Sequence, residues 1–237
     1  MAISAQSSIS HPSPSDPVGV LRLQKFLPPL LSAVAGMVDV IGFLSFGLFT
    51  AHVTGNLVVI AALLVRGGPP NVAAILAVPV FIVAVAGTWL IAKASGRCST
   101  ALVRPLLLVQ FLLLTCVLIF RVMSGSAAKP GLVAGVIAMI AVSAMACQFA
   151  LLRLGVPGAP STAVMTGNLT NTVLSLLDTL SGSEPLMQGS KERLRKTAEL
   201  VAGFFFGCLA GAMAVSWLGD WAWLLPVTFA GVAVVLR

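Results

Sequence analysis

The sequence contains too little charge for a soluble protein. Charged residues make up 9% of the 237 residues, whereas soluble domains carry about 25%. A water-soluble globule cannot cover its surface with so few charges, so the composition excludes a soluble catalytic domain. Apolar residues account for 58% of the chain and the mean hydropathy is +1.05. These values predict a membrane protein.

Recognisable catalytic and metal-binding patterns are also missing. The sequence contains no GxSxG, HExxH, GxGxxG or phosphate-binding glycine loop. The cysteines have no CxxC spacing, and all except Cys98, which lies in a basic loop, fall inside apolar blocks. Of the two histidines, His11 lies near the N-terminus, so the histidines form no cluster. We therefore expect no enzyme, no cofactor and no metal site.

The positive net charge indicates membrane orientation rather than nucleic-acid binding. The formal charge is +7, but the basic residues lie between apolar blocks instead of forming one surface. Residues 1–20 are rich in serine and proline and predict a disordered tail before one transmembrane domain at 21–237. Arg22 and Lys25 precede the first apolar block, so we expect a cytoplasmic N-terminus. The basic run at 191–196 predicts a cytoplasmic anchor that contacts anionic headgroups.

Long apolar blocks indicate an all-α polytopic bundle. Blocks of roughly 18 or more uncharged residues match the bilayer thickness, and the alternating period of barrel strands is absent. In hydrocarbon the backbone must satisfy its own polar groups, so such blocks form helices. We expect six long spans, at about 26–49, 72–92, 103–120, 131–152, 198–218 and 221–236.

A repeated tetrapeptide divides the chain into two halves. Thr54, Gly55, Asn56 and Leu57 recur as Thr166, Gly167, Asn168 and Leu169, and each copy begins a short apolar segment. In both halves a span with small residues follows, with Gly87 in the first and three glycines at 203, 207 and 211 in the second. The sequence therefore predicts two homologous halves, about 26–122 and 131–237.

The short segments at about 51–65 and 164–180 have two possible topologies. If each crosses the membrane, each half has four spans and the halves are parallel, with Cys98 outside the cell. If each is re-entrant, each half has three spans, the halves are inverted and Cys98 is inside. Both schemes place most of the 14 lysines and arginines in the cytoplasm. We favour the inverted arrangement, because paired interrupted segments are typical of inverted-repeat transporters.

Asp39 is the sharpest candidate for a functional residue. It lies roughly 20 Å along the first predicted helix, near the bilayer midplane. An aspartate at a helix centre costs about 2.5–3.5 kcal/mol on insertion scales, which favours burial inside the bundle. One hypothesis makes it a proton or cation site. The other makes it a structural acceptor for hydrogen bonds from a neighbouring helix end.

Other polar residues could complete such a site. Threonine or asparagine can cap a helix, so the two TGN segments predict helix starts that point free N–H groups at an anion, either a substrate or Asp39 itself. Packing corners are the alternative. His52 precedes the first TGN segment and is a candidate proton-linked residue or a plain interfacial histidine. Gln148 is a candidate for a hydrated path or an interhelical contact.

With these residues in view, the chain resembles the YoaK-like family of bacterial membrane proteins, which has no assigned function. The resemblance is carried by AGMVDVIGFLSFGLFTAHVTGNLV at 35–58, STAVMTGNL at 161–169 and FFFGCLAG at 204–211. It implies a bacterial inner-membrane protein and covers essentially everything after the tail. Asp39, Thr54, Gly55 and Asn56 match as motif positions, without an implied role.

Two functions remain open at this point. The first is a small-molecule or ion transporter whose site lies between the halves. That site would comprise Asp39, Thr54, Gly55, Asn56, Gln148, Thr166, Gly167 and Asn168, with His52 linked to protons. The second is a membrane scaffold or partner subunit that transports nothing. The expected partners are the lipid bilayer and an unknown small solute or ion, with no nucleic acid; an oligomer is compatible with either function.

Overall fold

The computed structural model describes residues 17–67, 71–96, 99–125, 131–156, 158–181 and 184–236. Within these ranges the regular elements are all helices, which confirms the all-α prediction. The first helix begins at Pro17, so the last four residues of the predicted tail are helical. Residues 1–16 and Cys98 lie outside the described residues.

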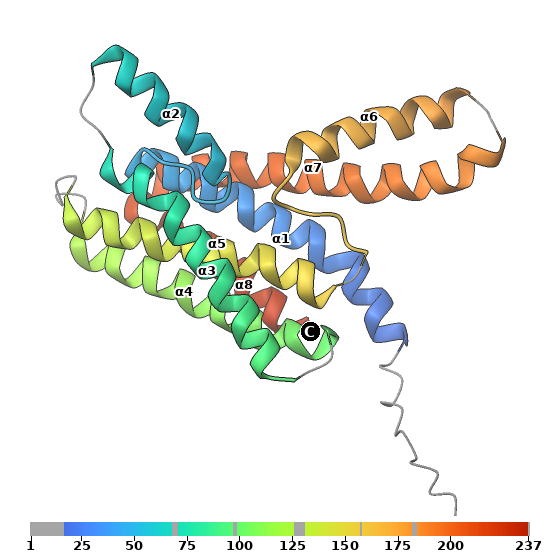
Figure 1. Cartoon of the computed structure of the whole chain (residues 1–237), viewed down its shortest axis with the longest axis horizontal. Coiled ribbons are helices and arrows are strands. Elements are labelled where there is room, and N and C mark those ends of the chain that lie inside the picture. Colours follow the sequence, from blue (N-terminus) through green and yellow to red (C-terminus); the bar gives the residue numbers. More distant parts are fainter. Residues whose placement is uncertain are drawn as a thin grey trace, which may run out of the picture.

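The helices follow one another in the order shown in Figure 1. The first half contains α1 (Pro17–Phe46), α2 (Val53–Arg66), α3 (Val72–Ala94), the short 3₁₀ helix η1 (Ser99–Leu102) and α4 (Val103–Ser124). The second half contains α5 (Leu132–Gly155), α6 (Met165–Ser181), α7 (Glu184–Leu218), the 3₁₀ helix η2 (Gly219–Trp223) and α8 (Leu224–Val235). Each half thus has one short helix after its first long one.

Five segments are long and apolar enough to cross a membrane: Lys25–Phe46, Val72–Ala94, Val103–Ser124, Leu132–Gly155 and Gly189–Val235. The last one joins the two spans predicted at 198–218 and 221–236, which η2 separates. The predicted sixth span falls on η2 and α8 within this segment. α8 has 12 residues and a length of roughly 18 Å, shorter than a hydrocarbon core of about 30 Å.

The directions of the helices show that the halves are inverted. One core cluster joins Leu27, near the start of the apolar span Lys25–Phe46 of α1, to Leu151 near the end of α5. A second cluster joins Ile41 near the end of α1 to Ile137 near the start of α5. α1 and α5 therefore run antiparallel, although they are the first helices of related halves.

The packing partners repeat in the same inverted sense. α1 packs against α7, and its counterpart α5 packs against α3. In the second pair, Ala74 lies with Ala138, and farther along both helices the ring of Phe81 lies 6.2 Å from that of Phe149, so α3 and α5 run parallel. The last helices of the two halves, α4 and α8, also contact each other. This arrangement agrees with the favoured inverted topology.

The chain turns back after α1, so α2 begins beside the middle of the bundle. Gly47 adopts φ +68°, a left-handed conformation that glycine tolerates without strain. The Thr50 hydroxyl then donates to the carbonyl of Val38 at 2.9 Å, two turns back along α1. From there α2 extends toward the end of the bundle at which α1 finished, and α6, packed along α7, extends toward the opposite end, at which α5 finished (Figure 1). Both short helices therefore behave as re-entrant segments.

Glycines allow α1 and α7 to pack backbone against backbone. A Cβ added at Gly203 would lie 2.7 Å from the carbonyl oxygen of Pro29, and one at Gly211 would lie 3.0 Å from that of Met37. A Cβ at Gly207, between them, would collide with the backbone of Ala33. Close approach of this kind is how transmembrane helices gain packing energy without a hydrophobic driving force.

We predict that Gly207→Leu destabilises the protein by at least about 1–3 kcal/mol, because the new side chain has only α1 backbone to displace. Gly87→Leu is the matched control, since no atom lies within 4 Å of its added Cβ. The measurement is the melting temperature of each purified variant in the same detergent. Equal melting temperatures for the two variants would contradict the close packing of α1 and α7.

The inverted topology predicts opposite labelling of two engineered cysteines in a Cys98→Ser background. Val65 near the end of α2 is 89% exposed, and Val65→Cys should react with a membrane-impermeant thiol reagent in spheroplasts. With the N-terminus in the cytoplasm, as the basic residues before the first span predict, α3 returns the chain to the cytoplasmic side, and Ser95→Cys should react only after lysis. If α2 crossed the membrane, the two labelling patterns would be exchanged.

Candidate functional site

The Asp39 carboxylate binds the backbone that leads into α2. Its Oδ1 accepts hydrogen bonds from the N–H groups of Thr50 and Ala51, both at 2.9 Å, and from that of His52 at 3.3 Å. Asp39 is only 5% exposed. These donors precede the first turn of α2 and would otherwise lack partners. Asp39 itself is thus the anion that this helix start binds, one of the two alternatives raised by the sequence.

The second carboxylate oxygen pairs with His52. His52 Nδ1 lies 2.7 Å from Asp39 Oδ2, with side-chain exposures of 27% and 6% respectively. A carboxylate can only accept hydrogen bonds, so the neutral imidazole must carry its proton on Nδ1 and donate it. Nε2 then presents a lone pair. This atom is buried and has no hydrogen-bond partner among the described residues.

The surroundings hold the His52 ring in place. The ring of Phe204 on α7 meets it edge to face, with centroids 5.0 Å apart. α7 can come this close to α1 because Gly36 has no side chain. A Cβ added at Gly36 would collide with the carbonyl of Phe204. Gly42 has a related role: its missing side chain makes room for Thr50, which lies 2.7 Å from the position of an added Cβ. The glycines flanking Asp39 therefore serve the site through packing.

The two TGN segments make similar local hydrogen bonds. These bonds do not join the two segments into one site. Asn56 is fully buried, and it donates to the carbonyl and accepts from the N–H of Phe49, both at 2.8 Å. Asn168 donates to the carbonyl of Ser161, seven residues earlier, at 2.8 Å. Both asparagines thus tie the returning loop to the helix it starts. Thr54 and Thr166 are exposed, and the glycines between are half-buried.

Gln148 belongs to a different buried network. Its amide donates to the carbonyl of Leu31 at 2.9 Å, and its oxygen accepts from Gln110 at 2.7 Å. All three residues are fully buried. Gln148 thus links α1, α4 and α5. Sequence reasoning missed Gln110, although a lone polar amide inside an apolar block is the same signal that identified Gln148.

We predict that Asn56→Ala and Asn168→Ala destabilise the protein, whereas Thr54→Ala and Thr166→Ala do not. Asn56→Ala removes two partly buried hydrogen bonds to Phe49 and Asn168→Ala removes one to Ser161, and a lost hydrogen bond costs about 0.5–1.5 kcal/mol. The threonines are exposed. The measurement is thermal unfolding of the four purified variants. A similar loss in the threonine variants would contradict the loop-tying role of the asparagines.

Comparison with known proteins gives one match. A family model described as "Protein of unknown function (DUF1275)" matches residues 27–236. Neither the curated proteins nor the solved structures contain a match to this chain. The family match confirms the resemblance to a family of unknown function, and it spans both halves of the fold.

Proposed function

The chain belongs to the DUF1275 family of proteins of unknown function, and we propose that it is a small secondary transporter in which the Asp39–His52 pair exchanges a proton as a solute or ion moves. The observation that carries this proposal is the buried His52 Nε2, which has no hydrogen-bond partner among the described residues. Imidazole is the side chain that takes up and releases protons near neutral pH.

Protonation of Nε2 changes the charge of the site. With neutral His52 and ionised Asp39, the pair carries one negative charge; with protonated His52, it carries none. A buried negative charge in an apolar bundle attracts a proton or a small cation, and its neutralisation lowers the cost of moving the site through the membrane. Coupling to a proton gradient requires a site whose charge changes in this way when it binds or releases a proton.

The fold supports the same proposal. Inverted halves with re-entrant segments that start at mid-bundle are the arrangement in which transporters place their binding sites. We place the protein in the bacterial inner membrane with its N-terminus in the cytoplasm, following the basic residues before the first span. Movement of a solute, rather than catalysis, is the proposed activity.

Asp39→Asn tests the proton role with little change to the fold. The amide oxygen of asparagine can still accept the three backbone N–H bonds, but the replacement removes the charge that pairs with His52. Asp178→Asn is the matched control: Asp178 lies on α6, and its Oδ2 accepts a hydrogen bond from Ser190 at 3.2 Å.

We expect wild-type proteoliposomes to give solute-dependent currents on a solid-supported membrane for at least one member of a panel of alkali cations, amino acids, carboxylates and nucleobases. Asp39→Asn should abolish the dependence of that current on pH, and Asp178→Asn should retain it. An unchanged pH dependence in Asp39→Asn would exclude the proton role.

A membrane scaffold is the second candidate function. It is favoured by the structural task of Asp39 Oδ1, which satisfies three backbone N–H groups without any solute. In that case no member of the panel gives a current, and Asp39→Asn changes only the melting temperature or the capture of a partner.

A further inference from the structure

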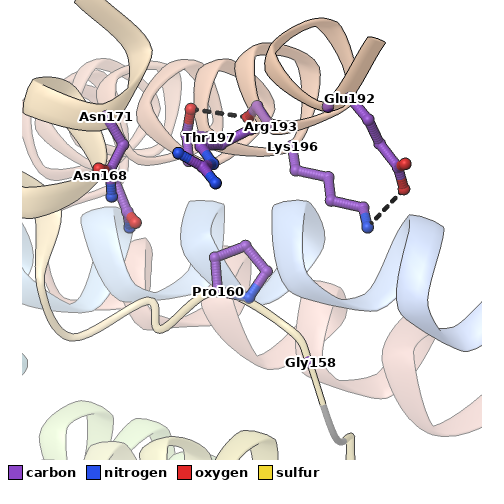
Figure 2. A pocket seen from close by; sticks show the side chains of 9 residues that line it. Gly158, Pro160, Asn168, Asn171, Glu192, Arg193, Lys196 and Thr197 are labelled. Atoms are coloured by element: carbon purple, nitrogen blue, oxygen red, sulfur yellow. Dashed lines mark hydrogen bonds and ion pairs between the residues drawn. The ribbon is translucent and has the colours of Figure 1, made fainter. Parts of the chain in front are cut away.

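A polar hollow of about 430 Å³ lies in the second half, apart from Asp39 and His52. Its walls are the loop at Gly158 and Pro160, the first turns of α6 and one face of α7 (Figure 2). α7 is longer than its counterpart α3, with 35 residues against 23. The α7 residues that line the hollow lie between Gly189 and Thr197, in the second to fourth turns of the helix.

Two asparagines and two cations are among the six polar side chains that line this hollow. Asn168 and Asn171 come from α6, and Arg193 and Lys196 come from α7 (Figure 2). Positions 189, 193, 196 and 197 share one face of α7, because residues three and four apart on a helix are neighbours. Gly189 has no side chain, and no atom lies within 4 Å of a Cβ added there.

The charges in the hollow are predominantly positive. Arg193 makes no ion pair within the described part of the chain, and Figure 2 shows its guanidinium on the side of Asn168 and Asn171. Lys196 lies 2.7 Å from Glu192, with side-chain exposures of 39% and 60%. A pair this exposed is weak, so Lys196 can exchange Glu192 for a stronger anion.

The hollow opens at the end of the bundle where α1 begins. A neighbouring hollow of about 260 Å³ shares Pro160, Glu192 and Lys196 with it and adds two cations, Lys25 and Arg195, and one acid, Glu199. Cations from the start of α1 and from α7 therefore gather at one level. With α1 starting in the cytoplasm, this level is that of the inner-leaflet headgroups, where anionic lipids attract lysine and arginine.

We propose that the hollow between α6 and α7 binds a phosphate group, carried by an anionic phospholipid or by a soluble phosphorylated compound. Arg193 supplies a planar fork that matches two phosphate oxygens, and Lys196 supplies a second point charge. The amides of Asn168 and Asn171 lie beside the same space. This site is additional to the proposed proton exchange, and neither Asp39 nor His52 takes part in it.

Thermal unfolding of the purified full-length protein tests the site. The probes are phosphatidylglycerol, phosphatidylcholine, inorganic phosphate and glycerol 3-phosphate, each titrated at about 0.3 M salt to screen diffuse surface attraction. A ligand that binds only the folded protein raises its melting temperature with concentration, which gives an apparent Kd. The variants are Arg193→Gln and Lys196→Gln. Lys191→Gln is the matched control, because Lys191 is exposed on the same helix and lines neither hollow.

We expect phosphatidylglycerol to stabilise the wild-type protein more than phosphatidylcholine does. Arg193→Gln and Lys196→Gln should each weaken that effect by about tenfold, as expected for the loss of a charge-assisted hydrogen bond. Lys191→Gln should leave it nearly unchanged. Glu192→Gln should strengthen it, because the carboxylate that competes for Lys196 is gone.

The two sources of phosphate give different results. Stabilisation by glycerol 3-phosphate or inorganic phosphate that is lost in Arg193→Gln, without an effect of phosphatidylglycerol, identifies a soluble ligand. Equal weakening by Arg193→Gln and Lys191→Gln would show diffuse surface charge and overturn the proposal. Absence of stabilisation by every phosphate probe would also overturn it. None of these outcomes depends on transport through the Asp39–His52 pair.

Discussion

Three backbone N–H groups inside the bundle need an acceptor, and Asp39 Oδ1 provides it. A re-entrant chain exposes backbone that no helix satisfies, and hydrocarbon offers no water in exchange. The carboxylate therefore makes it possible for the chain to turn back after Gly47 and to start α2 beside the middle of α1. Its negative charge also lies at the positive end of the α2 dipole. The hydrogen bonds from these backbone N–H groups offset the free-energy cost of burying the Asp39 carboxylate.

The second half performs the same turn by different means. Thr50 and Thr162 are both fully buried at matching places before the TGN segments, and Asn56 and Asn168 make the same bond to the loop. Val164, however, stands two positions before the second TGN segment, as His52 stands before the first. The charged pair is thus confined to the first half, and the polar hollow at α7 is confined to the second. The duplicated fold has diverged into two chemically different ends.

This division has a functional consequence. The Asp39–His52 pair is buried and offers one nitrogen without a partner, which suits the exchange of a single proton. The hollow between α6 and α7 is open and cationic, which suits an anion at the membrane surface. The glycine seam of α1 and α7 and the glutamine network link the helices of the bundle through packing and buried hydrogen bonds. Both proposed sites use α7, so movement of that helix would affect both.

The sequence by itself determined the helical membrane class and indicated the two halves, Asp39 and the TGN segments, because apolar block length and an exact repeat are local properties. It could not determine that Asn56 ties its own loop, that Gln148 bonds Gln110, or that the 3₁₀ helix η2 separates α7 from α8. Those outcomes depend on which residues far apart in the chain become neighbours. Only the tertiary structure decided between crossing and re-entrant segments. The lysines and arginines fit both schemes, whereas the directions of the packed helices fit only the scheme with re-entrant segments.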